Sequence, residues 1–469
     1  MKSFNLIDSP WIPVRYGHKT KLLSLTDLFL DSENITDLSC VSHERIAITR
    51  LLIAIASAAV GPVQYDDELP EIKPLIVNLS VEYLKKWHDS FDLFDANNPF
   101  LQVGNLTCES ISKLEKINIL LSSGSTTTWR DNAGGSQRSF SPDSIARSLL
   151  AYQGFALNGR IGFAKWDGIP TGSGGLGTVS SEAAPLHNIL NTLLIGSNLL
   201  ETIYLNIISV DHLDSMQFGK PIWEFMPKNP KDEAAIKNAT ETYLGRLVFL
   251  SRTVKIIDEQ HCLLSNGLSY PELYDPFSTI VTDKDGKPIS VKPNVEQSLW
   301  RQLPAILNAT TAGKPRCLVI HPNEIYKIWV GGTAGTGGVN ATIKGVVESI
   351  FQISNPKAYI DGADFAYKNW KKLENSIKSF CITFFNNPSK NDVNYFKKSA
   401  EINYWASLDR SVYKLFKLEQ PEQPEQPEQN IQKQEWERLV KNSAYEAFDL
   451  TCPKTNWKAL AVGRQCLNQ

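Results

Sequence analysis

The apolar positions along residues 1–355 predict a mixture of strands and helices. Residues 4–14 contain strand-forming side chains interrupted by two prolines, and a Tyr-Gly-His turn follows, a pattern typical of a short hairpin at a sheet edge. Along residues 42–60 apolar side chains recur at helical spacing, which predicts an amphipathic to buried helix. The remaining patterns predict helices at 79–94, 142–153 and 185–200, and strands at 203–210, 247–257 and 315–330. Because these elements follow no regular βαβ order, we expect mixed rather than doubly wound α/β structure.

After about residue 356 the pattern becomes helical. Three long stretches rich in Lys, Glu and aromatic side chains predict a C-terminal helical bundle, at residues 365–385, 391–418 and 432–450. Residues 419–429 repeat the triplet Glu-Gln-Pro, and their prolines favour an extended, solvated linker between two of these helices. The chain is therefore predicted to contain two domains, residues 1–355 and 356–469.

The composition is that of a globular protein without a membrane span. The 469 residues exceed the size at which one hydrophobic core stops growing, which also favours two domains. The longest apolar stretch, residues 46–60, is interrupted by polar side chains and is shorter than the roughly 20 apolar residues that a membrane-spanning helix needs. Because the N-terminus lacks the apolar region of a signal peptide, we expect a cytoplasmic protein. The net charge of −2 implies that any nucleic-acid-binding surface is a local patch.

The residue types that usually carry catalysis or metal binding show no diagnostic spacing. The seven cysteines include no C-x-x-C pair, and the seven histidines show neither H-x-x-x-H nor H-E-x-x-H spacing. Carboxylate pairs such as Asp66 and Asp67 are too ordinary to indicate a magnesium site. In the glycine-dense run 331–344, Lys344 stands six residues beyond Gly338, whereas a phosphate-binding loop needs lysine directly after its last glycine. We therefore expect no metal, no cofactor and no enzymatic activity.

Three blocks of sequence, spread over the whole chain, form a more specific signature. Residues 4–14 read FNLIDSPWIPV, and residues 91–102 read FDLFDANNPFLQ. Residues 404–408 read YWASL, and Trp436 and residues 444–448, AYEAF, follow them. In this order the blocks resemble the CasA family, the large subunit of the type I-E CRISPR Cascade surveillance complex.

The resemblance implies an α+β fold, with a mixed α/β N-terminal domain of unusual topology and a C-terminal four-helix bundle. It implies that the N-terminal domain recognises the protospacer-adjacent motif on double-stranded DNA and starts strand separation for R-loop formation. The implied partners are the other Cascade subunits, the guide CRISPR RNA, the double-stranded target DNA and a helicase-nuclease recruited in trans, with no membrane. A structural scaffold that does not recognise the motif and a nucleic-acid-processing enzyme are the alternative functions.

The glycine-dense run contains the first candidate for contact with target DNA. The resemblance places Val339, Asn340, Ala341 and Thr342 on a wedge, a hairpin tip whose amide side chain enters the duplex beside the motif. Such insertion unstacks bases at a few kcal/mol per step, which new protein and guide contacts offset. Asparagine at position 340 stands where the family often has glutamine, which is one methylene longer. A surface turn held open by glycines is the alternative.

A second candidate follows the helix predicted at 142–153. The resemblance places Asn158, Gly159 and Arg160 on a glycine loop that lies in the DNA minor groove, and a narrow minor groove attracts arginine. The family pattern has three consecutive glycines there, whereas this chain has Asn-Gly-Arg. A turn at the C-terminus of the helix is the alternative. The glycine-rich run 172–177 is a lower-ranked candidate for the same groove contact.

Two further polar turns are candidate contacts. The resemblance places a groove-contacting lysine at Lys284, in an Asp-Gly turn that favours a hairpin, and Lys287 is its rival. A solvated hairpin tip without DNA contact is the alternative. In the polar loop 126–138, the resemblance places the guide-RNA handle contact, for which we select Trp129, Arg130 and Asn132 because aromatic and basic side chains stack bases and hold phosphates. A plain surface loop is the alternative.

Overall fold

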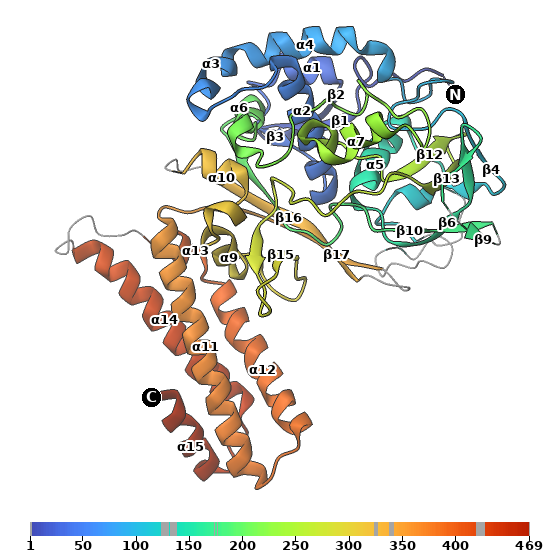
Figure 1. The fold of residues 1–469 in the computed structure, drawn as a ribbon. Coiled ribbons are helices and arrows are strands. Elements are labelled where there is room, and N and C mark those ends of the chain that lie inside the picture. Colours follow the sequence, from blue (N-terminus) through green and yellow to red (C-terminus); the bar gives the residue numbers. More distant parts are fainter. Residues whose placement is uncertain are drawn as a thin grey trace. The chain divides into compact units, whose positions relative to one another are not determined.

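The computed structural model describes residues 2–122, 131, 138–172, 174–175, 177–322, 327–336, 342–418 and 427–468. The chain divides into two compact units (Figure 1). The first comprises Met1–Glu296 and Ala309–Ile350, and the second comprises Gln297–Asn308 and Phe351–Gln469. The short segment Gln297–Asn308 belongs to the second unit although it precedes part of the first in sequence, so the chain crosses between the units more than once.

The first unit combines short helices with several small antiparallel sheets. Its helices are α1 (Leu25–Leu30), α2 (Ser42–Val60), α3 (Leu69–Ile72), α4 (Ile76–Lys86), α5 (Pro142–Phe155), α6 (Leu199–Leu205), α7 (Glu233–Glu241), α8 (Tyr243–Leu247) and α10 (Arg316–Ile320). Its strands are β1 (Ile12–Tyr16), β2 (Lys19–Leu23), β3 (Asp37–Leu38), β4 (Leu106–Cys108), β5 (Ser112–Lys113), β6 (Gly159–Gly162), β7 (Ala164–Trp166), β8 (Ile169–Pro170), β9 (Gly174–Gly175), β10 (Thr178–Ser181), β11 (Asn191–Ile195), β12 (Arg252–Ile256), β13 (His261–Asn266), β14 (Ile280–Thr282), β15 (Pro288–Ser290), β16 (Lys327–Thr336) and β17 (Thr342–Gln352).

The sheets do not merge into one layer. Their strand orders are β2-β1-β3, β4-β7-β8, β6-β10-β9, β12-β13-β5, β11-β16-β17 and β14-β15. Sheets of two or three strands cannot enclose a core alone, so helices must cover them. This is the mixed α/β architecture of unusual topology that was predicted.

Helix α2 lies at the centre of the first unit and packs against α4, α5, α6, α8 and β16 (Figure 1). Its residues from Ile46 to Ser57 are buried on all sides of the helix. The helix ends before Gly61, whose φ of +89° is a conformation that favours glycine. The prediction of a helix at residues 42–60 is confirmed. A helix that is apolar on all sides must lie inside a core, as α2 does.

The first two signature blocks pack against each other. Leu6 N donates to Phe91 O at 2.9 Å, and Leu93 N donates to Phe4 O at 3.0 Å. The hairpin predicted from residues 4–14 begins only at Ile12, and its first strand β1 lies between β2 and β3 rather than at an edge. The second strand of this hairpin, β2, is an edge strand, so the predicted edge hairpin and its turn are confirmed, although the hairpin begins later than predicted.

Two neighbouring elements were predicted with the wrong type of secondary structure. The helix predicted at 185–200 contains strand β11, and the strand predicted at 203–210 begins in helix α6. All five residues of β11 are buried, and periodicity cannot distinguish so short a buried strand from a buried helix. The Asn206 side chain connects the two elements, because it accepts a hydrogen bond from Leu194 N at 3.0 Å and donates to Leu194 O at 2.8 Å.

The other predicted elements are confirmed in whole or in part. Helix α5 and strand β12 fall at the predicted positions 142–153 and 247–257. Helix α4 ends at Lys86, so the predicted helix 79–94 was too long, and the predicted strand 315–330 is helix α10 followed by β16. Pro315 directly precedes α10, and helices tolerate proline at their start.

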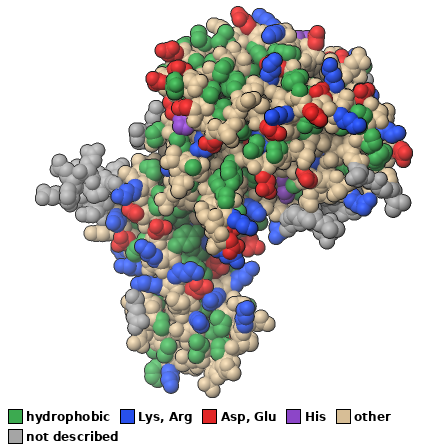
Figure 2. All heavy atoms as spheres, in the orientation of Figure 1, with side chains coloured by type: hydrophobic (Ala, Val, Ile, Leu, Met, Phe, Trp, Pro, Cys, Tyr) green, Lys and Arg blue, Asp and Glu red, His purple; other side chains and the backbone are tan. Residues whose placement is uncertain are grey.

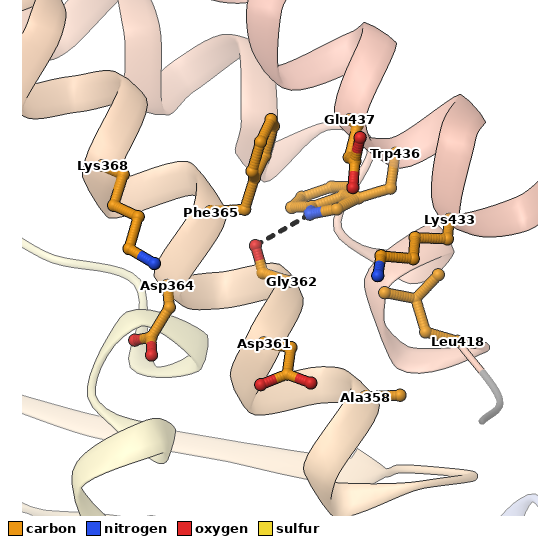
Figure 3. Close-up of a pocket in the computed structure, with 10 residues that line it drawn as sticks. All are labelled: Ala358, Asp361, Gly362, Asp364, Phe365, Lys368, Leu418, Lys433, Trp436 and Glu437. Atoms are coloured by element: carbon orange, nitrogen blue, oxygen red, sulfur yellow. Dashed lines mark hydrogen bonds between the residues drawn. The ribbon is translucent and has the colours of Figure 1, made fainter.

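The second unit is a helical bundle. Its long helices are α11 (Pro356–Phe385), α12 (Lys390–Asp409), α14 (Pro427–Thr451) and α15 (Trp457–Asn468), and two short helices, α9 (Leu303–Leu307) and α13 (Tyr413–Phe416), accompany them. Helix α11 packs against α12, α14 and α15, which confirms the predicted bundle. Inside it, Trp436 is fully buried and its Nε1–H donates to Gly362 O at 2.9 Å (Figure 3).

The predicted linker 419–429 is only partly described. Residues 419–426 lie outside the described residues, whereas residues 427–429 form the first turn of α14 rather than extended chain. Pro427 is the first residue of this helix, where the missing N–H has no partner to lose and the fixed φ is helical. The last three residues of the prediction were therefore wrong.

Candidate nucleic-acid interface

The predicted wedge belongs to the hairpin formed by β16 and β17. Val339, Asn340 and Ala341 lie outside the described residues, and Thr342 is the first residue of β17. Strand β16 pairs with β11 in antiparallel register, with Trp329 opposite Leu193 and Gly331 opposite Asn191. The described part of the hairpin is therefore its stem, which is one edge of the sheet β11-β16-β17.

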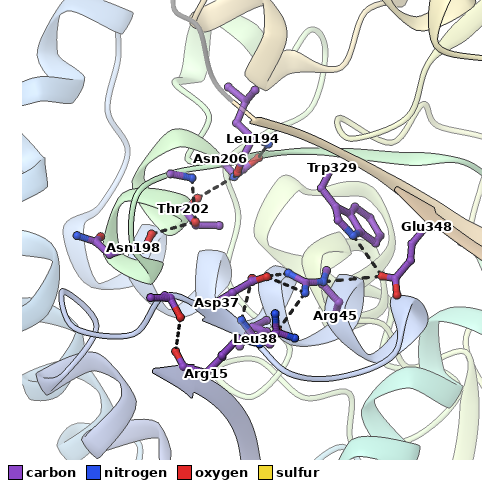
Figure 4. A network of polar contacts seen from close by, with 12 residues as sticks. Arg15, Asp37, Leu38, Arg45, Leu194, Asn198, Thr202, Asn206, Trp329 and Glu348 are labelled. Atoms are coloured by element: carbon purple, nitrogen blue, oxygen red, sulfur yellow. Dashed lines mark hydrogen bonds and ion pairs between the residues drawn. The ribbon is translucent and has the colours of Figure 1, made fainter. Parts of the chain in front are cut away.

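The stem is anchored to helix α2 (Figure 4). Glu348 Oε2 accepts a hydrogen bond from Trp329 Nε1 at 3.3 Å and lies 4.0 Å from Arg45 Nε. The same guanidinium binds both carboxylate oxygens of Asp37, at 2.5 and 3.0 Å. Ser42 Oγ also donates to Val347 O at 3.1 Å. These contacts hold both strands of the stem against the core.

Close packing explains part of the glycine density in the stem. A Cβ on Gly331 would lie 2.4 Å from the Trp329 ring, and a Cβ on Gly332 would lie 2.3 Å from Ile189 O. A Cβ on Gly335 would lie 2.6 Å from His187. Any larger residue at these positions would push the strand from its neighbours, so these three glycines serve packing of the stem.

The segment Asn158–Arg160 begins a strand. Helix α5 ends at Phe155, its C-cap residue Ala156 has φ −56°, and Gly159, at φ +147°, is the first residue of β6. Glycine therefore does not cap this helix, and that alternative was wrong. Arg160 is exposed and pairs with Ser180 on β10, and its Nε and Nη2 donate to Thr178 Oγ1 at 2.9 and 2.6 Å.

A cavity of about 340 Å³ lies beside this segment and is lined by residues 158–161. Three basic side chains line it: Lys116, Arg160 and Arg252. Among the described residues that line the cavity, none is acidic. An anion held about 4 Å from one such charge gains on the order of 4 kcal/mol at an effective dielectric constant of about 20. The cavity is therefore suited to an anionic group such as phosphate.

Arg252 is the buried charge beneath this cavity. It is 2% exposed, and its guanidinium donates to the main-chain oxygens of Ser251, Leu157 and Glu182 at 2.7, 2.7 and 2.6 Å. Burial lowers the pKa of Arg252, because the charged form loses hydration. Carbonyl oxygens satisfy its hydrogen bonds without cancelling its charge, which the nearby Glu182 carboxylate offsets in part.

The loop predicted to contact the guide RNA begins beside the same cavity. Trp129, Arg130 and Asn132 lie outside the described residues. Asp131 accepts hydrogen bonds from Ser122 N and Arg138 Nη2, each at 2.6 Å, and so joins the two ends of the loop. Leu121, which precedes Ser122, lines the cavity. The described start of this loop and the segment Asn158–Arg160 therefore line one cavity, which their distance in sequence could not reveal.

Lys284 lies in the turn of the predicted hairpin, formed by β14 and β15. Asp283 organises this turn: its main-chain N–H donates to Lys287 O at 2.8 Å, and its carboxylate accepts from Lys287 N at 2.8 Å. Gly286, at φ +80°, supplies the conformation that the turn requires. Both Lys284 and Lys287 are exposed, so the structure makes either one available to a phosphate.

Residues 182–188 connect the cavity with the wedge stem. Glu182 O accepts from Arg252, and Asn188 Oδ1 accepts from Gly335 N in β16 at 3.3 Å. The six residue steps between these two positions span at most about 21 Å. The distance between Glu182 and Asn188 is therefore at most the rise of about six base pairs, at about 3.4 Å each. In the lower-ranked run 172–177, strand β9 pairs with β10, while residues 173 and 176 lie outside the described residues.

The charge elsewhere on the surface is mixed. On the face shown in Figure 2, basic and acidic side chains are interspersed over both units. A second cavity, of about 510 Å³, lies between α11 and α14 in the bundle (Figure 3). Acidic Asp361, Asp364 and Glu437 line it together with basic Lys368 and Lys433. This combination has no preference for an anion, unlike the cavity beside Asn158–Arg160.

One group of potential metal ligands was missed by the sequence analysis. Asp66, Asp211 and His212 each bring a ligand atom within 4.8 Å of the others, and His212 Nε2 lies 2.8 Å from Asp66 Oδ2. Asp66 is distant in sequence from the other two, so no spacing motif could reveal the group. His212 Nε2 is already hydrogen-bonded to the partly exposed Asp66 carboxylate, which by itself explains the cluster.

No described helix combines the length and apolarity needed to cross a membrane.

Residues 5–447 match the family of the CRISPR-associated protein Cse1. The CRISPR-associated protein CasA/Cse1 of Thermus thermophilus is 27% identical over 324 residues, which cover 66% of this chain and 61% of that relative. The chain thus spans less than two thirds of that relative's length.

Two solved structures share the fold over nearly the whole chain. Thermobifida fusca Cse1 has a TM-score of 0.79 and 20% identity, covering 99% of this chain and 96% of its own. A chain of a CRISPR RNA-guided surveillance complex has a TM-score of 0.76 and 17% identity, covering 99% of both chains. Because the family match extends over most of the sequence, this chain belongs to the CRISPR-associated Cse1 family, also named CasA.

Proposed function

We propose that this chain is the large subunit of a type I-E Cascade, an RNA-guided surveillance complex, and is not itself an enzyme. It recognises the protospacer-adjacent motif on double-stranded DNA, starts strand separation and recruits a helicase-nuclease in trans. Its other partners are the remaining Cascade subunits and the guide CRISPR RNA, in the cytoplasm. The observation that carries the proposal is the cavity with three basic and no acidic described lining residues beside Asn158–Arg160, in a member of the Cse1 family.

The four candidate segments have separate roles in this proposal. The wedge, Val339 to Thr342, enters the duplex from a stem that is anchored to α2. Asn158, Gly159 and Arg160 contact the minor groove, whose donor and acceptor pattern distinguishes mainly A·T from G·C pairs. Lys284 contacts the DNA backbone from its exposed turn. This division of labour leaves the target sequence to base pairing with the guide, as in other RNA-guided systems.

The guide contact is assigned to the loop between Ser122 and Arg138, with Trp129, Arg130 and Asn132 as its contacting residues. The Asp131 contacts support this assignment because they hold both ends of the loop in one place. A loop closed in this way can present an aromatic and a basic side chain without opening the core.

A binding experiment on the guide-loaded complex tests the proposal. The complex contains either the wild-type chain or the double variant Asn340→Ala with Arg160→Ala, and it binds duplexes that carry a few randomised base pairs beside the guide-matched sequence. Sequencing of bound duplexes measures the motif preference. Since a mismatched base pair in a specific site costs about 1–3 kcal/mol, the wild type should enrich preferred motifs by roughly fivefold to more than a hundredfold.

We expect the double variant to assemble and to lose this enrichment. The control carries the same two substitutions on exposed sites of the first unit, Asn105→Ala with Arg15→Ala, and should retain the enrichment. If wild type and double variant select the same motifs, the two residues do not recognise the motif. If the wild type itself selects none, the scaffold alternative replaces the proposed function.

A further inference from the structure

We propose that the cavity beside Asn158–Arg160 holds one unpaired nucleotide, whose phosphate contacts Lys116 and Arg160 and whose base lies against the apolar wall. The inference rests on the proposed function, because it assigns a ligand to the same region of the molecule. It goes beyond that function by separating two modes of contact: a duplex lying across the outside of β6, and a single nucleotide inside the cavity.

The cavity's size favours a nucleotide over a duplex. Its volume of about 340 Å³ lies near the lower end of the roughly 300–1,000 Å³ range of small-molecule sites. A duplex is much wider than its minor groove, which alone measures about 6 Å across, so it cannot enter such a cavity. An unpaired nucleotide can enter, because it can turn away from its neighbours and expose both its phosphate and the face of its base.

The charges are arranged for one phosphate. Lys116 Nζ lies 3.3 Å from Ser112 Oγ, and no ion pair within 4.0 Å joins it to a carboxylate of the described residues. Arg160 also lines the cavity and is exposed on β6, where its guanidinium donates to Thr178 Oγ1. Beneath them, buried Arg252 adds a positive charge whose hydrogen bonds go to main-chain oxygens. A phosphate held between Lys116 and Arg160 would complement all three charges.

Part of the remaining wall is apolar, although Asn118, Asn158 and Ser181 also line the cavity. Leu157, Ile161 and Leu264 line the cavity together with the ring of Tyr152. Leu264 is 2% and Tyr152 8% exposed, so this wall is set into the core of the first unit rather than projecting from it. Bases bind surfaces of this kind through their flat faces, which every base possesses, so the contact tolerates any sequence. The cavity thus offers a phosphate contact and a base contact on neighbouring walls.

The neighbouring loop makes the guide RNA the favoured source of this nucleotide. Leu121 belongs both to the cavity wall and to the chain entering the loop that Asp131 closes. An RNA strand bound at the described start of that loop, at Leu121 and Ser122, would lie beside the cavity. The separated target DNA strand carries the same phosphate and base chemistry, so it is the second source that the experiment must distinguish.

The test measures binding of the full-length chain to fluorescein-labelled octanucleotides of RNA and of single-stranded DNA by fluorescence anisotropy, over a series of salt concentrations. We expect Lys116→Ala to weaken binding roughly tenfold, as loss of a charged hydrogen bond predicts. Removing one phosphate contact should also reduce the slope of log K against log salt by about 0.7. Lys116→Arg should keep both values near those of the wild type.

Lys113→Ala is the matched control. Lys113 stands three residues earlier, its side chain is 54% exposed, and it pairs with Glu115 at 3.8 Å instead of lining the cavity. Tighter binding of RNA than of DNA would assign the nucleotide to the guide, and the reverse would assign it to the separated strand. The proposal is overturned if Lys116→Ala and Lys113→Ala weaken binding equally, or if unlabelled duplex competes as well as single strands.

The two proposals can fail separately. Motif enrichment that depends on Asn340 and Arg160, with octanucleotide binding that ignores Lys116, would support the proposed function and refute the nucleotide site. Octanucleotide binding that depends on Lys116, in a complex without motif enrichment, would support the nucleotide site and refute motif recognition.

Discussion

Removing the buried charge of Arg50 should strongly destabilise the first unit. Arg50 is 1% exposed in the middle of α2, and its Nη1 donates to Asp275 Oδ1 at 2.9 Å. Its other N–H groups donate to Leu247 O at 3.0 Å and Arg246 O at 2.6 Å. The guanidinium carbon lies 5.1 Å from the Phe249 ring centre. One side chain thus joins α2, the end of α8 and the Asp275 segment.

The expected loss follows from what Arg50→Met leaves behind. Methionine fills much of the space but leaves the buried Asp275 carboxylate without its cation, which costs about 3–5 kcal/mol in comparable buried pairs. Asp275→Asn in the wild type should also destabilise, because a neutral amide pairs less well with the guanidinium. In the Arg50→Met background the same Asp275→Asn change should instead restore stability, because it removes the uncompensated charge.

Urea unfolding, followed by circular dichroism and tryptophan fluorescence, measures these effects as shifts in midpoint at unchanged slope. The control Arg15→Met makes the same substitution on an exposed position of β1 and should change stability by no more than about 0.5 kcal/mol. Additive effects of Arg50→Met and Asp275→Asn would refute the reasoning, because they would show that the two charges do not interact.

Three further predictions concern pH, the bundle and the wedge stem. Burial lowers the pKa of His43 to about 4, so the unfolded chain, with a histidine pKa of about 6.5, takes up its proton first as pH falls. Between pH 7 and pH 5 this should cost about 2 kcal/mol of unfolding free energy, and urea titrations of His43→Leu should lack that loss. Trp436→Phe removes the donor to Gly362 O and should lower the bundle's urea midpoint by an amount equivalent to about 1–2 kcal/mol. Gly332→Ala places a Cβ 2.3 Å from Ile189 O and should speed amide exchange in β16 and β17. Gly172→Ala, where the nearest atom is at 3.6 Å, should leave that exchange unchanged.

The spacing of apolar residues was sufficient to predict an element where that element is long enough to bury the same face over several turns. Residues 42–60 and 142–153 were predicted as helices from apolar spacing alone, because a helix of several turns repeats its signal. The pattern failed at β11 and α6, where five buried residues contain too few periods to distinguish a strand from a helix. There, long-range pairing decided the outcome, since β16 pairs with all five residues of Asn191–Ile195.

The sequence by itself determined the family, the mixed α/β and helical-bundle architectures, and the segments that carry unusual chemistry. Each of these can be recognised from residues that are adjacent in sequence. Only the tertiary structure decided that Lys116, Arg160 and Arg252 line one cavity and that Asp131 closes the neighbouring loop. Likewise, only the fold shows that the stem glycines make room for Trp329 and Ile189. Contacts between residues far apart in sequence leave no periodic signal, because they depend on how whole elements pack.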